Sequence, residues 1–196
     1  AGTKNMSKAD TTVTGIESGL DINVGGVSDL MAQAQGTVDA DSSSVSGFAK
    51  AYGNTTGMGV NDLEMKVASD SDFSSTSTLI GDVDASTTDG LASAKVALDS
   101  TGVEGIEIGI GGINDFSAIS SVSANADASN VGGDASTSMG DLDSSALTGG
   151  WMHSASDSDV SGIATLDGGI SASSTAQAAA AVGDFDADGI TGLAIG

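Results

Sequence analysis

The chain has 196 residues, of which 29 are glycine, and aromatic residues make up only 3% of it, so a core of bulky side chains is excluded. It has no cysteine, which excludes disulfides, thiolate metal sites and cysteine nucleophiles. The 27 acidic residues face five lysines and no arginine, and the net charge of −22 excludes nucleic acid as a partner, because phosphate binding requires basic side chains.

The predicted elements begin with a strand-like leader over residues 1–19, because the segment 13–17 is similar to the later segment 103–107. Apolar and polar residues alternate over 20–24 and again over 106–110, which is typical of half-buried β-strands. Residues 48–52 follow a glycine as a further short strand. The alanine-rich segment 176–182 corresponds to 92–95 two repeats earlier, so a strand is predicted there too. The sequence therefore predicts an all-β fold.

A repeat of about 43 residues organises the chain. A Ser/Asn-Asp-apolar triplet recurs with spacings of 43, 43 and 44 residues, at 28–30, 71–73, 114–116 and 158–160. A short apolar segment lies eight residues before each triplet, and a fifth copy stands at 193–195. The predicted organisation is a leader over 1–19, a stub of a fifth repeat over 193–196 and, between them, four repeats at 20–62, 63–105, 106–149 and 150–192.

Repeats of small residues cannot bury enough apolar area alone, so they are expected to stack with like residues above like. The first predicted stacking ladder contains Ile22, Met65, Ile108, Met152 and Ile195. The second contains Leu30, Phe73, Phe116 and Val160. A third runs through Ala49, Ala92, Ala135 and approximately Ala179. The absence of proline fits a stack in which backbone N–H groups donate to the next layer.

The predicted fold is thus a β-solenoid or cross-β stack of four repeats. One rung per repeat advances the axis by roughly 19 Å over four rungs, and two rungs per repeat by roughly 38 Å. The segments at both ends are similar to interior rungs, and no polar cap is evident, which favours a head-to-tail homopolymer.

In composition, repeat number and uncapped ends, the chain loosely resembles the functional-amyloid subunits of biofilm fibres such as curli and the Fap fibres. This resemblance implies secretion and fibre formation and assigns no residue roles. The function expected is that of a non-enzymatic structural subunit of an extracellular filament, sheath or biofilm matrix fibre. The first residue is alanine, which is typical of a secreted chain without its signal peptide, and no apolar run is long enough for a transmembrane segment.

An alternative function is kept open at this point. A monomeric secreted β-solenoid could bind Ca²⁺ or ice through a flat repetitive face, with the hydroxyl-rich run 74–78 as a candidate surface. Light scattering separates the two functions, since only the first requires polymers. Apart from a possible Ca²⁺ ion, no cofactor is predicted.

The candidate Ca²⁺ ligands are Asp184, Asp186 and Asp188, in a D-x-D-x-D-G run whose glycine permits a tight turn. The segment 182–196 weakly resembles the calcium-binding FG-GAP repeat, although Gly192 stands where that family has an acidic ligand. An ordinary solvated Asp-Gly turn is the other interpretation of the run.

The remaining acidic residues are divided between turns and strand faces. One aspartate per repeat is predicted to accept hydrogen bonds in a turn: Asp29, Asp72, Asp115 and Asp159. Pairs two residues apart on a strand, such as Asp39 with Asp41 and Asp82 with Asp84, are either half-sites for divalent cations or a solvated, repelling surface. Stacking of so many carboxylates predicts that acid and divalent cations favour assembly.

Overall fold

The computed structural model describes residues 3–16, 20–22, 30–68, 72–111, 115–152 and 159–195. These residues are β-strand almost throughout, which confirms the all-β prediction, and the part described holds no helix that could cross a membrane. The strands are β1 (Thr3–Ile16), β2 (Leu20–Ile22), β3 (Leu30–Ala68), β4 (Asp72–Gly111), β5 (Asp115–Asn130), β6 (Asp134–Met152), β7 (Asp159–Ser174), β8 (Gln177–Val182) and β9 (Phe185–Ile195).

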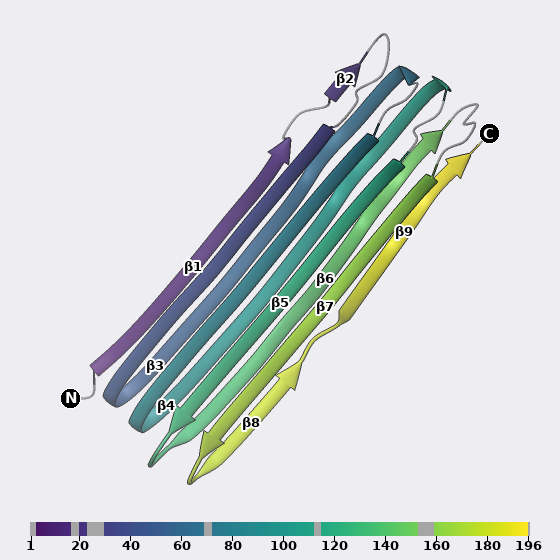
Figure 1. The fold of residues 1–196 in the computed structure, drawn as a ribbon. Helices are drawn as coiled ribbons and strands as arrows, with labels where there is room; N and C mark the ends of the chain where they lie inside the picture. Colours follow the sequence, from purple (N-terminus) through teal and green to yellow (C-terminus); the bar gives the residue numbers. More distant parts are fainter. Residues whose placement is uncertain are drawn as a thin grey trace.

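The two longest strands, β3 and β4, fold back on themselves near their midpoints (Figure 1). Glycines make this reversal possible: Gly47 and Gly90 have φ angles of 106° and 124°, which side chains with a Cβ rarely adopt. A Cβ on Gly90 would also lie 1.6 Å from the carbonyl oxygen of Gly47. Each reversal carries the chain from one layer of strands to another that runs in the opposite direction.

The strand pairs among the described residues are parallel, and the passes of the chain form two layers. The four-strand layer contains residues 30–46, residues 72–87, β5 and β7. The five-strand layer contains β1 with β2, residues 47–68, residues 91–111, β6, and β8 with β9. Hydrogen-bonded neighbours within a layer are 43 or 44 residues apart, as with Leu30 and Phe73 or Asp115 and Asp159. Ser77 and Ser100, which are 23 residues apart, lie in opposite layers.

The strand register pairs the residues that form the two apolar columns singled out by the sequence repeat. The first column is Ile22, Met65, Ile108, Met152 and Ile195. The second column is Leu30, Phe73, Phe116 and Val160. The alanine column ends at Ala178, one residue before the expected Ala179, because the connection between β7 and β8 is one residue shorter than that between β5 and β6 and returns the spacing from 44 to 43.

The core lies between the two layers, where alternate side chains of each pass point inward. Phe73 and Phe116 are its largest fully buried side chains, and their rings stack with centroids 5.0 Å apart. A row of buried serines separates the two apolar clusters: Ser77, Ser100, Ser120 and Ser144. Their hydroxyls form hydrogen bonds from layer to layer, whereas the buried hydroxyls of Ser42 and Thr55 have no hydrogen-bond partner among the described residues.

Small residues set the distance between the layers, which gives a first prediction. A Cβ on Gly102 would lie 2.5 Å from the carbonyl oxygen of Ala146 and 3.1 Å from that of Ile119, one in each layer. We expect Gly102→Ala to lower the free energy of unfolding by about 1–3 kcal/mol, because neither backbone can move aside. Gly169→Ala is the control, since only Asn125 Oδ1 at 3.5 Å lies near its Cβ position. Equal urea midpoints for the two variants would contradict this packing.

Candidate functional site

The open ends of the stack are the first candidate functional feature. Among the described strands, β1 and residues 30–46 form one end, and β7, β8 and β9 form the other; each is hydrogen-bonded to a neighbour on one side (Figure 1). The backbone donors and acceptors on the other side of such edges are available to a further parallel strand. We refer to these as the β1 end and the β9 end.

Apolar side chains that point toward the core are exposed at the β9 end. Val182, Phe185 and Ile190 are 57%, 47% and 41% exposed. Their hydrogen-bonded neighbours on β6 occupy the same columns and are at most 2% exposed: Met139, Leu142 and Leu147. The difference arises because no described strand lies on the outer side of β8 and β9. A further strand there would bury these three side chains, as β8 and β9 bury their counterparts on β6.

The two ends differ in their charged residues. Lys4 and Lys8 lie on β1, where the Lys8 ammonium is 2.5 Å from Asp10 and the Lys4 ammonium lies 5.4 Å from the ring centroid of Phe48. The β9 end carries aspartates on both passes: Asp159, Asp167, Asp184, Asp186 and Asp188. The β1 end also carries Asp10, Asp39 and Asp41, so only its two lysines complement the aspartates of the β9 end.

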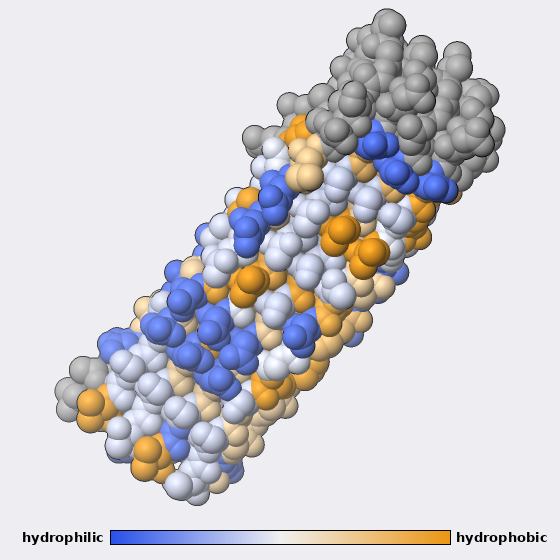
Figure 2. Space-filling view, in the orientation of Figure 1, coloured by the Kyte–Doolittle hydropathy of each residue, from blue (hydrophilic) through white to orange (hydrophobic). Residues whose placement is uncertain are grey.

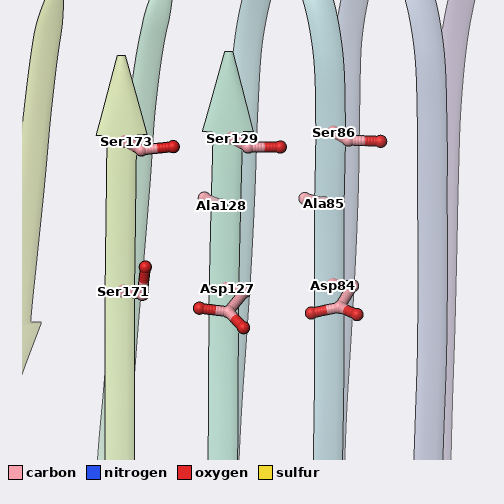
Figure 3. A pocket seen from close by; sticks show the side chains of 8 residues that line it. All are labelled: Asp84, Ala85, Ser86, Asp127, Ala128, Ser129, Ser171 and Ser173. Carbon is pink, nitrogen blue, oxygen red and sulfur yellow. The ribbon is translucent and has the colours of Figure 1, made fainter.

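An acidic surface on the four-strand layer is the second candidate feature. Strand register stacks Asp41, Asp84 and Asp127 on adjacent strands, and Ser171 continues the column. Figure 3 shows Asp84, Asp127 and Ser171 at one level along their strands, with a parallel row of Ser86, Ser129 and Ser173. These residues line a shallow groove of about 400 Å³. In Figure 2, strongly hydrophilic residues gather in a band that runs across the strands, as in-register stacking of like residues predicts.

Asp84 and Asp99 have raised pKa values. Burial raises the pKa of Asp84 above its ordinary value. Nearby carboxylates raise this pKa further, namely Asp82, Asp127, Asp41 and Asp39. One amide interrupts the repulsion, because Asn125 donates hydrogen bonds to Asp82 (3.1 Å) and Asp127 (3.4 Å). Asp99, on the five-strand layer, also has a raised pKa through burial and the charges of Asp143 and Glu104.

A prediction about pH follows from these raised pKa values. The folded chain binds the Asp84 and Asp99 protons more tightly than the unfolded chain, in which a carboxyl has a pKa of about 4. The contribution of these two groups to the free energy of unfolding should therefore fall as the pH rises from about 4 through their raised pKa values. We expect Asp84→Asn to stabilise the chain at pH 7 and to reduce this slope. Asp167→Asn on β7 is the control, and an equal gain from it would contradict the stacked-carboxylate explanation.

The predicted turn aspartates form a column in the part of the chain that the structure describes. Asp72 pairs with Asp115, and Asp115 pairs with Asp159, at the starts of their strands. Asp29 lies outside the described residues. The turn-capping role assigned to these residues stays a prediction.

The proposed calcium ligands lie at a strand junction. Asp184 stands between β8 and β9, where its N–H donates to Asp141 Oδ1 at 3.3 Å and its carbonyl accepts from the N–H of Leu142. Asp186 and Asp188 follow on β9. Over the described residues, no group of three or more histidine, cysteine, aspartate or glutamate side chains is placed to hold a metal ion. Calcium binding here therefore stays a prediction from the motif alone.

The hydroxyl-rich run 74–78 does not form a single surface. Ser75 and Ser77 point inward and are buried, whereas Ser74, Thr76 and Thr78 point outward, because side chains alternate along a strand. The Ser75 hydroxyl donates a 2.7 Å hydrogen bond to the carbonyl of Gly102 in the opposite layer. Sequence reasoning also missed the column of Asp41, Asp84 and Asp127, although their 43-residue spacing was a visible signal.

Comparison of the chain with protein-family models, with curated proteins and with solved structures found no match.

Proposed function

We propose that this chain is a structural subunit of an extracellular filament, sheath or biofilm matrix fibre, assembled by stacking a β-solenoid of 43-residue repeats end to end. The observation that carries this proposal is the β9 end. There, Val182, Phe185 and Ile190 are exposed, although the members of the same columns on β6 are buried. Open parallel strand edges accompany them at both ends.

A second copy of the chain is the partner that these edges fit best. A parallel strand edge accepts another parallel strand of matching length, and the β1 end offers such strands together with Lys4 and Lys8. Because the two ends are different surfaces, each added copy exposes a new β9 end or β1 end. A contact of this type propagates without closing, which produces a filament.

The small residues and the absence of proline support a structural role. Gly and Ala between the layers allow close packing, as in the dry interfaces of cross-β assemblies. In the proposal the chain is not an enzyme, and the acidic groove around Asp84 belongs to the outer surface of the fibre, where divalent cations would reduce its charge repulsion.

Light scattering and negative-stain microscopy of the purified chain test this function. The proposal predicts unbranched filaments that form faster at lower pH or with added Ca²⁺, since both reduce repulsion between copies of charge −22. A monodisperse species of 18.8 kDa at every pH and Ca²⁺ concentration would contradict it and would favour a monomeric β-solenoid that binds its ligand through one face.

A further inference from the structure

The two layers are displaced relative to each other along the stacking direction. A Cβ on Gly53 would lie 2.6 Å from Val38 and 2.8 Å from Val83, which belong to successive passes of the opposite layer. Likewise, a Cβ on Gly168 of β7 would lie 3.0 Å from Met139 of β6 and 3.4 Å from Phe185 of β9. Each pass thus faces the space between two passes across the core, so successive passes advance by half a strand spacing.

The row of buried serines follows the same stagger. The Ser100 hydroxyl donates to Ser77 in the layer opposite, while the Ser100 carbonyl accepts from Ser120 on the next strand of that layer. Ser144 then donates to Ser120. The hydrogen bonds cross the core repeatedly, which places the pass containing Ser100 between the passes containing Ser77 and Ser120.

This stagger gives both ends of the described stack the same profile. The first pass, β1, and the last, β8 with β9, belong to the five-strand layer. At each end the five-strand layer therefore projects half a strand spacing beyond the four-strand layer. Residues 30–46 are recessed at the β1 end, and β7 is recessed at the β9 end.

Two copies in the same orientation do not fit together at such ends. If β1 of one copy pairs with β8 and β9 of another, residues 30–46 and β7 are two strand spacings apart, about 9.6 Å. That leaves a gap one strand wide in the four-strand layer. The inward side chains on both sides of this gap would remain in contact with water, and its backbone groups would lack strand partners.

A half-turn about the stacking axis removes the gap. The rotation exchanges the two layers, so the projecting β1 meets the recessed β7, and the recessed residues 30–46 meet the projecting β8 and β9. It also reverses strand direction, and because the two layers run in opposite directions (Figure 1), both new pairs are parallel. The joint then repeats the stagger found within the chain.

The charges at this joint are mixed. Lys4 and Lys8 of β1 would lie along β7, which carries Asp159 and Asp167 on its exposed face. Asp39 and Asp41 would lie along the pass that carries Asp184, Asp186 and Asp188, a repulsion that acid or divalent cations reduce. The inward positions of residues 30–46 are small, with Ala32, Ala34, Gly36 and Ala40 among them. They leave room for the larger side chains of the β9 end.

We propose, on the basis of the stacking function above, that successive copies in the filament are related by a half-turn about its axis. In this joint, β1 of one copy pairs with β7 of the preceding copy, and residues 30–46 pair with its β8 and β9. Nine staggered passes give an axial rise of nine half-spacings, about 22 Å per copy. Copies in one orientation would rise by five full spacings, about 24 Å.

Helical reconstruction of filaments from the 196-residue chain by electron cryo-microscopy tests the joint. The expected result is a rotation near 180° and a rise of about 22 Å per copy, from the 4.8 Å strand spacing. A rise of about 24 Å without rotation would overturn the half-turn while leaving the filament function intact. Failure to form filaments under any condition would overturn both.

Engineered cysteines give an independent test, because the chain has none of its own. If Lys4 is placed opposite Asp159, the first residue of β7, outward-facing side chains lie together, and Lys8 of one copy lies beside Ile163 of the preceding copy, within disulfide range. In the unrotated joint, Lys8 would instead lie beside Ala181, which ends the column of Lys8, Tyr52, Lys95, Ser138 and Ala181.

We expect the Lys8→Cys/Ile163→Cys variant to form a ladder of covalent multimers on oxidation. The matched variant Lys8→Cys/Ala181→Cys should stay monomeric on a denaturing gel. The reverse pattern would overturn the half-turn.

Discussion

Replacing Phe185 by lysine is expected to prevent filament growth while leaving the single chain folded. Phe185 is 47% exposed in the isolated chain, so a lysine there keeps its ammonium in water. In a filament the same position continues a column whose previous members, Leu98 and Leu142, are fully buried. Burying an unpaired ammonium costs several kcal/mol, so we expect the critical concentration for assembly to rise by about a hundredfold or more.

The control for this variant is Ile80→Lys. Ile80 is also exposed, at 40%, and its substitution changes the net charge equally. It lies on an interior pass, and its column, with Thr37 and Ser123, points out of the stack, so a lysine there stays solvated in the filament. Sedimentation of assembled material against protein concentration measures both variants. Equal critical concentrations for the two lysine variants would contradict the assignment of the β9 end as the growing surface.

Replacing Phe116 by alanine is expected to cause the largest loss of stability. Phe116 is 1% exposed, stacks on Phe73 and lies in the cluster that joins the two layers. Its removal should lower the free energy of unfolding by about 3–5 kcal/mol, because the rigid layers cannot close over the cavity. Urea unfolding monitored by circular dichroism, at concentrations below assembly, measures this loss.

Phe185→Ala is the matched control for the same substitution. Phe185 lies on the outermost layer and is half exposed, so its loss should cost less than half as much in the isolated chain. The effects on assembly should have the opposite order. Phe185→Ala should raise the critical concentration more than Phe116→Ala does, because Phe185 lies at the joint and Phe116 does not. Similar unfolding midpoints for Phe116→Ala and Phe185→Ala would mean that the core is not where these contacts place it.

The all-β class was predictable because alternation and repeat length are properties of the sequence itself. Leu20, Ile22 and Val24 alternate with polar residues, and the 43-residue spacing limits which residues can be neighbours in a parallel stack. The course of each repeat was harder to predict. The reversals at Gly47 and Gly90 depend on positive φ angles, and the sequence does not distinguish these glycines from the many others.

The candidate site was less predictable than the fold. Asp184, Asp186 and Asp188 attracted a metal assignment because a short motif was visible, whereas the acidic column through Asp84 depends on three distant positions brought together by register. The exposed columns at the β9 end depend on which pass comes last in each layer. No local sequence pattern encodes this difference in exposure between the last strand of a layer and the strand before it.

X-ray diffraction from aligned filaments tests the central claim most directly. If the parallel layers continue from copy to copy, strands lie perpendicular to the filament axis. A strong meridional reflection at about 4.8 Å is then expected, with an equatorial reflection at about 10 Å for the packed layers. Filaments whose reflection at about 4.8 Å lies on the equator, or that lack it, would show that the copies do not assemble by stacking their strands.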